Sequence, residues 1–135
     1  MARKPIKRVR LSRRSALKTR RRPEVAELDA LCREVVLLRD RHRCAWCGKT
    51  SNIQWCHVHS RRVYSLRWDI RNSVVLCAGC HLRWHAHPLE GATWFYQTYP
   101  ARHHDLVMLR QTKQKPDLAA IRLYLLAEKK RLGGV

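Results

Sequence analysis

The chain has few acidic residues and no long apolar segment. It contains 10 Asp and Glu against 29 Lys and Arg among 135 residues, so its formal net charge is +19. No apolar stretch approaches the ~18 residues that indicate a membrane span. The basic N-terminus also lacks the apolar segment that follows it in a secretory signal. We therefore expect a protein with no membrane partner that binds a polyanion.

The first 22 residues lack acids and have too few apolar residues to build a core. Residues 1–23 hold eleven Lys or Arg and no acid, and like charges that cannot be buried keep a segment unfolded. We expect residues 1–22 to be a disordered basic arm that binds DNA through pairs of Arg with phosphate. A solvated tail is the alternative. Residues 23–135 then form a single domain.

Apolar periodicity predicts that this domain is α+β. Apolar residues recur at helical spacing from Pro23 to about Arg41, and Cys32 falls on the buried face of that helix. Residues 53–57 and 73–76 predict two short paired strands, followed by a helix from Cys80 to about Ala86. Further helices are predicted over residues 88–99, 101–112 and 116–131, so a core of residues 44–88 precedes a helical region of residues 89–132.

Four of the six cysteines form two C-x-x-C pairs, Cys44 with Cys47 and Cys77 with Cys80. This spacing is too tight for ordinary disulfides and lets two thiolates reach one tetrahedral zinc ion. We expect a closed, structural Zn²⁺ site and a reducing, cytoplasmic location. The alternatives are a redox dithiol and chance clustering of the cysteines. The 29 residues between the pairs exceed the length in a simple zinc ribbon, so a further hairpin is inserted there.

The inserted hairpin and the following helix contain the groups that phosphodiester hydrolysis requires. A histidine such as His57 can take the proton of a water molecule near neutral pH, and a divalent cation can stabilise charge on the phosphoryl oxygens. His81 and His85 are four residues apart on a predicted helix, so both imidazoles lie on one face and suit one cation. The alternatives are a hydrogen bond to the zinc thiolates for His81 and a solvated helix face for His85.

These residues resemble the zinc-containing HNH endonucleases, also called ββα-metal or His-Me finger nucleases. The likeness is greatest to the small phage and prophage type that includes the recombination nuclease NinG. It covers about residues 44–88, a third of the chain, and rests on two zinc knuckles combined with His, Asn and His in the order of the family motif. The matching positions are Cys44–Cys47, Gln54–His57, Arg67–Asp69, Asn72, Leu76–Cys77, Cys80–His81 and His85.

The resemblance implies a catalytic role for three residues. His57 matches the general base that activates water, and His81 matches a ligand of the catalytic cation. Asn72 matches the residue that fixes the loop between the strands or helps to hold the metal, although a purely local turn role is the alternative. The metal would be Mg²⁺ or Mn²⁺, with Zn²⁺ or Ni²⁺ as further candidates.

One position departs from the family pattern. Cys56 stands where many members have a metal-ligating Asp or His, and a thiolate suits zinc and other soft cations better than Mg²⁺. If Cys56 faces the core instead, His59 or His85 could complete the coordination. Strand alternation places His59 on the same face as His57, which favours a position near the site.

Arginines crowd the loop between the predicted strands. We expect Arg61, Arg62 and Arg67 to hold DNA phosphates beside the cation, which would position the DNA without reading its sequence. Trp68 could stack on bases or pack beneath the loop. The resemblance implies hydrolysis of DNA, duplex or branched, in phage recombination or DNA processing within a bacterial or phage-infected cell.

Two other functions fit the same features. A non-catalytic, zinc-stabilised nucleic-acid-binding module would have the same charge and the same cysteines, and an RNA-directed nuclease would share the metal chemistry. A homodimer would suit cleavage of two strands, and the apolar face of the last predicted helix, residues 116–131, offers a surface for it.

Overall fold

The computed structural model describes residues 22–112 and 114–135, and the predicted basic arm lies outside them apart from Arg22. The described chain is α+β, as the sequence predicts. Its strands β1 (Ile53–His57) and β2 (Ser73–Cys77) pair antiparallel, with His57 opposite Ser73. The connection between them contains two short 3-10 turns, η1 (Tyr64–Leu66) and η2 (Ile70–Asn72). The helices are α2 (Pro23–Arg39), α3 (Ala78–Ala86), α4 (Pro88–Thr98), α5 (Pro100–Gln111) and α6 (Leu118–Arg131).

The predicted elements are confirmed, with small shifts at their ends. Helix α2 ends at Arg39, two residues before the predicted limit, and Arg41 and His42 then adopt positive φ angles of 55° and 51°. Helix α3 begins at Ala78, before the predicted Cys80, because the Cys77 sulfur caps it by accepting a hydrogen bond from the backbone N–H of Cys80.

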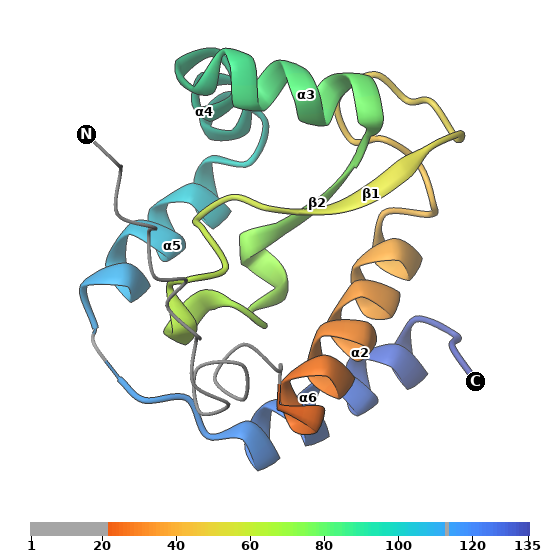
Figure 1. Ribbon diagram of the computed structural model, residues 1–135, viewed down its shortest axis with the longest axis vertical. Coiled ribbons are helices and arrows are strands. Elements are labelled where there is room, and N and C mark those ends of the chain that lie inside the picture. The colour runs from red at the N-terminus through yellow and green to blue at the C-terminus, as the bar shows by residue number, and fades with distance from the viewer. Residues whose placement is uncertain (1–21, 113) are drawn as a thin grey trace, which may run out of the picture.

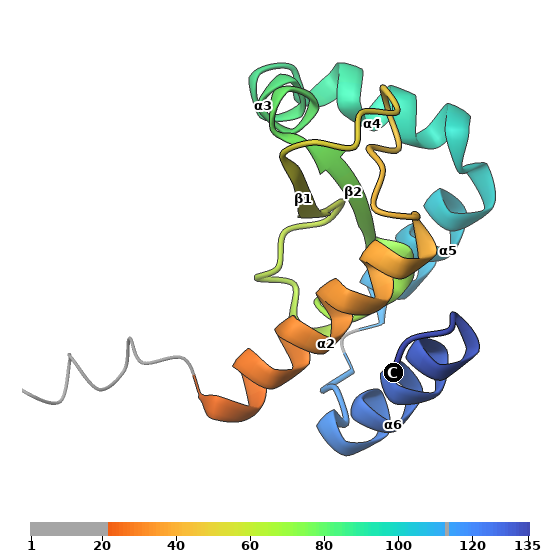
Figure 2. The ribbon, with the colours of Figure 1, turned by 90° about the vertical axis from the view of Figure 1, so that its right-hand side faces the viewer.

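Helices cover the two-stranded sheet on both sides (Figures 1 and 2). Helices α3, α4 and α5 lie on one side, and α2 and α6 lie next to each other on the other. Strand β2 is buried along its whole length, and its alternation divides the core: Val74 and Leu76 face the α3–α5 side, whereas Val75 faces α2 and α6. A strand buried on both faces explains the unbroken apolar run in this segment.

The apolar face of α6 is used within the chain. Leu125 is fully buried against the α2 side of the core, and Leu118 and Ile121 pack beside it. Lys129 pairs with Glu34 of α2 at 3.0 Å. This face is therefore not the open surface that the sequence suggested for a homodimer. The homodimer stays a prediction, but the apolar face of α6 no longer supports it. None of the described helices combines the length and the apolarity that a membrane crossing requires.

Candidate functional site

The four paired cysteines converge at one point between the loop after α2 and the start of α3. Cys44 and Cys47 lie on a turn that closes at Gly48, whose φ of +80° favours glycine. The backbone N–H of Ala45 donates to Val75 O at 2.8 Å and so fixes this turn on β2. Cys77 ends β2 and Cys80 lies in the first turn of α3. All four sulfur atoms are within 4.8 Å of one another.

This cluster fits a tetrahedral zinc ion. Four sulfurs at about 2.3 Å from one ion are about 3.8 Å apart, and the Cys47 and Cys77 sulfurs are separated by 3.6 Å. Burial raises the pKa of Cys44, but backbone hydrogen bonds at Cys47, Cys77 and Trp46 outweigh it and lower the pKa to about 7. Among the described residues no other group of three or more Cys, His, Asp or Glu is placed to share an ion. The cluster could hold a structural metal such as zinc.

His57 ends β1 and is held in one tautomer. Its Nε2 lies 3.1 Å from the backbone oxygen of Arg67, and because a carbonyl only accepts, Nε2 carries the hydrogen. The ring also contacts Trp55, with centroids 4.4 Å apart. Burial lowers the pKa of His57, although the carbonyl of Arg67 opposes this. His57 is therefore neutral at pH 7, with the lone pair on Nδ1.

His81 and His85 point their Nε2 atoms at each other across one turn of α3, at 3.0 Å. The Nδ1 of His81 donates to Gln54 Oε1 at 2.5 Å, which leaves a lone pair on His81 Nε2 directed at His85. Burial and the neighbouring His85 lower the pKa of His81. Two nitrogens about 2.1 Å from one cation and at right angles would be about 3.0 Å apart. The pair fits two adjacent ligand positions.

One cavity of about 470 Å³ brings these groups together. It is bounded by the end of β1, the following loop and α3. His57, His81 and His85 line it, together with Cys56 and Arg61. The structure thus joins three of the predicted site histidines and one predicted DNA contact in a single space, from segments up to 28 residues apart in sequence.

Cys56 has the surroundings of a core thiol. It is 5% exposed, and burial raises its pKa to about 12, so the sulfur is protonated at neutral pH. Its S–H donates to the backbone oxygen of Gln54 at 3.6 Å. Cys56 thus belongs to the core, and the two α3 imidazoles are the groups of the cavity that could bind a cation.

Asn72 and His59 are joined to each other and not to the cavity. The Asn72 side chain is fully buried, and its Oδ1 accepts from the His59 N–H at 2.8 Å. Its Nδ2 donates to the backbone oxygens of His59 and Leu66, both at 3.1 Å. The Asn72 amide therefore closes the loop between the strands, which is the loop-fixing alternative for this residue. Its oxygen is not directed at His81.

His59 does not follow the strand alternation that the sequence suggested. Strand β1 ends at His57, so the period of two does not extend to His59. The His59 ring instead contacts the Arg110 guanidinium of α5, with Nδ1 and Nη1 2.9 Å apart. His59 does not line the cavity of His81 and His85, so its place as a cation ligand stays a prediction.

Arg67 is internal, which corrects its prediction as a DNA contact. It is 9% exposed, and its guanidinium donates to both carboxylate oxygens of Asp29, at 2.9 and 2.7 Å. Trp68 is also buried and donates its Nε1–H to the same carboxylate at 3.0 Å. Trp68 therefore packs beneath the loop. Arg61 and Arg62 are exposed on the loop and keep their predicted role as a hypothesis.

Three residues near the site were not predicted. Gln54 fixes the His81 ring, and its alternation with Cys56 on β1 could have indicated that it faces α3. Asp29 and Arg110 come from helices more than 35 residues from their partners. No local pattern in the sequence indicates these two contacts.

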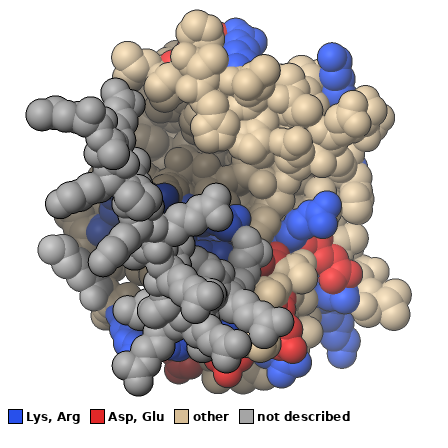
Figure 3. Space-filling model, viewed as in Figure 1, with Lys and Arg blue, Asp and Glu red and all other residues tan. Residues whose placement is uncertain are grey.

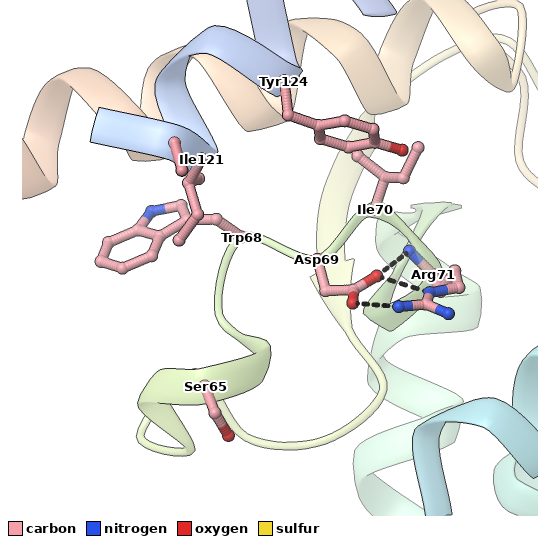
Figure 4. A pocket seen from close by; sticks show the side chains of 8 residues that line it. Ser65, Trp68, Asp69, Ile70, Arg71, Ile121 and Tyr124 are labelled. Atoms are coloured by element: carbon pink, nitrogen blue, oxygen red, sulfur yellow. Dashed lines mark hydrogen bonds and ion pairs between the residues drawn. The ribbon is translucent and has the colours of Figure 1, made fainter. Parts of the chain in front are cut away.

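A second cavity of about 550 Å³ lies between η2 and α6 (Figure 4). Its walls are formed mainly by Trp68, Ile70, Ile121 and Tyr124. The charged groups that line it, Asp69 and Arg71, bind each other at 2.8 Å. It contains no histidine and no converging ligands, so the cavity at His57 is the better candidate for chemistry.

Comparisons with protein-family models, curated proteins and solved structures give no match to this chain. The described chain offers three sets of groups for chemistry: the four thiols, the neutral His57 and the imidazole pair of α3.

Proposed function

We propose that this protein is a metal-dependent HNH endonuclease that hydrolyses DNA phosphodiester bonds. The observation that carries the proposal is the single cavity in which a neutral histidine with a free lone pair lies with two converging imidazoles. A general base and a cation site are the two components that this hydrolysis needs. The order strand, loop, strand and helix, with His57 on β1 and His81 on α3, also agrees with a ββα-metal arrangement.

In this proposal His57 removes the proton from the attacking water. Its Nε2–H is held by the backbone oxygen of Arg67, so Nδ1 is the acceptor. The lowered pKa keeps the ring in its neutral, proton-accepting form at pH 7. Burial of the ring among Trp55 and the loop fixes its direction, which limits the reorganisation needed before reaction.

His81 and His85 would hold the catalytic cation. When bound, the cation would neutralise charge on the phosphoryl group and on the departing oxygen. Gln54 orients the His81 ring through Nδ1, as hydrogen bonds to ligating histidines commonly do. Because imidazole suits Ni²⁺ and Zn²⁺ better than Mg²⁺, we expect activity to be greater with these two transition metals.

The distribution of charge supports a nucleic-acid substrate. Residues 41–66, which include β1 and the loop beside the cavity, carry five Lys and Arg and no acid. Helices α3 and α4 together carry one Arg and one Glu, and the upper part of the face in Figure 3 is mostly uncharged. Positive charge thus gathers on the segment that borders the cavity. By its family resemblance, the proposed setting is phage recombination or DNA processing.

A cleavage assay tests the proposal. Supercoiled plasmid and a four-way junction would be incubated with Mg²⁺, Mn²⁺, Ni²⁺, Zn²⁺ or no added cation. We expect His57→Ala to keep its fold and zinc content but to lose cleavage by about 10²- to 10⁴-fold. His104→Ala, a change at an exposed histidine of α5, should cut like the parent. Equal cleavage by parent and His57→Ala would refute the assignment of the base.

The alternative, a non-catalytic zinc-stabilised nucleic-acid-binding module, is favoured by one observation. Cys56 is a neutral core thiol at a position where the family often has a metal ligand, so the cavity offers two ligands and not three. This alternative predicts tight, salt-sensitive binding with no cleavage in any of the four cations. Running the same assay with an RNA duplex separates an RNA-directed nuclease from a DNA-directed one.

A further inference from the structure

We propose that His59 and Arg110 form a second phosphate-binding point, outside the cavity of His57, that holds the DNA backbone beside the reacting phosphate. The inference deepens the proposed function and rests on it for the identity of the polyanion. It starts from a contact that neither motif nor spacing indicates: the guanidinium of Arg110, on α5, reaches the ring of His59 on the loop after β1.

The backbone of His59 is held rigidly. Its backbone N–H and C=O are both bound by the buried side chain of Asn72, at 2.8 and 3.1 Å. Because Asn72 is itself fully buried and also bonded to Leu66, this part of the loop cannot move without breaking several hydrogen bonds. A ligand that binds His59 therefore meets a preformed position.

The contact between His59 and Arg110 leaves N–H donors free for a ligand. A guanidinium only donates, so His59 Nδ1 is the acceptor of the 2.9 Å contact and His59 Nε2 carries a hydrogen. Arg110 keeps further N–H groups that this contact does not use. The pair thus presents several donors and one full positive charge, which matches the acceptor oxygens of a phosphate.

The positive charge of Arg110 has no carboxylate partner in the part of the chain that the structure describes. Among residues 22–112 and 114–135, no carboxylate lies within ion-pair distance of Arg110. In contrast, Arg67 and Arg71, on the loop that α5 packs against, pair with Asp29 and Asp69. Burial, then Arg110 and then His103 lower the pKa of His59. An external anion is the group that would balance this charge.

His59 lies close in sequence to residues that line the cavity of His57. His59 follows His57 by two residues, so their Cα atoms are at most about 7 Å apart. Ser60 and Arg61, the next residues of the loop, line the cavity itself. Since successive phosphates of one DNA strand rise by about 3.4 Å, a strand that enters the cavity would place a neighbouring phosphate near His59 and Arg110.

Binding of a labelled DNA duplex, measured by fluorescence anisotropy without added divalent cation, tests this point. All proteins would carry His57→Ala, so that no cutting intervenes. Arg110→Gln should lower the slope of log affinity against log salt by about one. It should therefore shrink the parent's change in affinity between about 50 and about 200 mM salt by about 3.5-fold. The control is Arg122→Gln on α6, which should leave the slope unchanged.

The outcomes separate this inference from the nuclease proposal. A reduced slope with Arg110→Gln but not with Arg122→Gln supports the second phosphate point, even if no cation produces cleavage. An unchanged slope with Arg110→Gln overturns it, even if the parent cuts DNA. His59→Gln keeps a side-chain donor but not the ring, so it should weaken binding without changing the slope, because the charge of the pair is carried by Arg110. Normal binding by that variant would also contradict the inference.

Discussion

Removal of the Asp29 carboxylate should destabilise the protein strongly. Asp29 is 7% exposed, and its two oxygens accept from both arms of the Arg67 guanidinium. In Asp29→Ala the Arg67 cation stays buried without this partner, and Trp68 also loses the acceptor for its Nε1–H. Loss of one member of a buried ion pair costs about 3–5 kcal/mol. For a domain of this size that is a fall of roughly 12–20 °C in Tm.

The same network leads to the proposed active site. Arg67 supplies the backbone oxygen that holds His57 Nε2, so a shift of Arg67 would release the base. We therefore expect Asp29→Ala to lose cleavage as well as stability. A free energy of unfolding of about 5–15 kcal/mol is usual for a domain, so the variant should still fold at low temperature and can be measured there.

Urea denaturation, followed by tryptophan fluorescence and circular dichroism, measures the effect. The control is the double variant Asp29→Ala/Arg67→Met, in which no uncompensated charge stays buried. It should be more stable than Asp29→Ala alone. A loss of less than about 1 kcal/mol in Asp29→Ala would show that Arg67 finds another partner and would refute this reasoning.

Three further predictions follow from metal binding, protonation and packing. Cys77→Ala should lose bound zinc and most of its helical circular dichroism together, because metal binding and folding are coupled in small sites; elemental analysis of the purified variant checks this, and a folded, zinc-free product would contradict it. The free energy of unfolding should fall as the pH drops below about 6.5, because burial lowers the folded-state pKa of His57, His59 and His81. Below that pH the unfolded chain binds more protons than the folded chain. Denaturation curves between about pH 7 and pH 5 measure this loss, which ends once the pH is below the folded-state pKa values. Gly91→Ala should destabilise α4 by about 1–3 kcal/mol despite the better helix propensity of alanine, because the added Cβ would lie 2.6 Å from the ring of Trp84; a higher Tm in this variant would show that the ring can move aside.

Local patterns in the sequence determined the secondary structure and the cysteine site. The strand Ile53–His57 and the helix from Pro88 follow from spacing and turn residues that act over a few positions. The C-x-x-C pairs indicated four converging thiols because two-residue spacing restricts where each pair can point. The H-x-x-x-H spacing likewise placed His81 beside His85 on one turn of helix. In each case the deciding contacts are made within one short segment or, for the two cysteine pairs, between segments that could share one ion.

The tertiary structure alone decided the roles of the other polar residues. The basic loop around Arg67 predicts a phosphate contact, but α2 brings Asp29 against Arg67 and makes it internal. Strand alternation predicts that His59 continues β1, but the strand ends at His57 and α5 supplies Arg110 as the partner of His59. A charged side chain takes the partner that packing places within about 3 Å, and sequence distance has no influence on that choice. The sequence therefore determines which groups are available for chemistry, and the packing of helices around the hairpin determines which of them face the cavity.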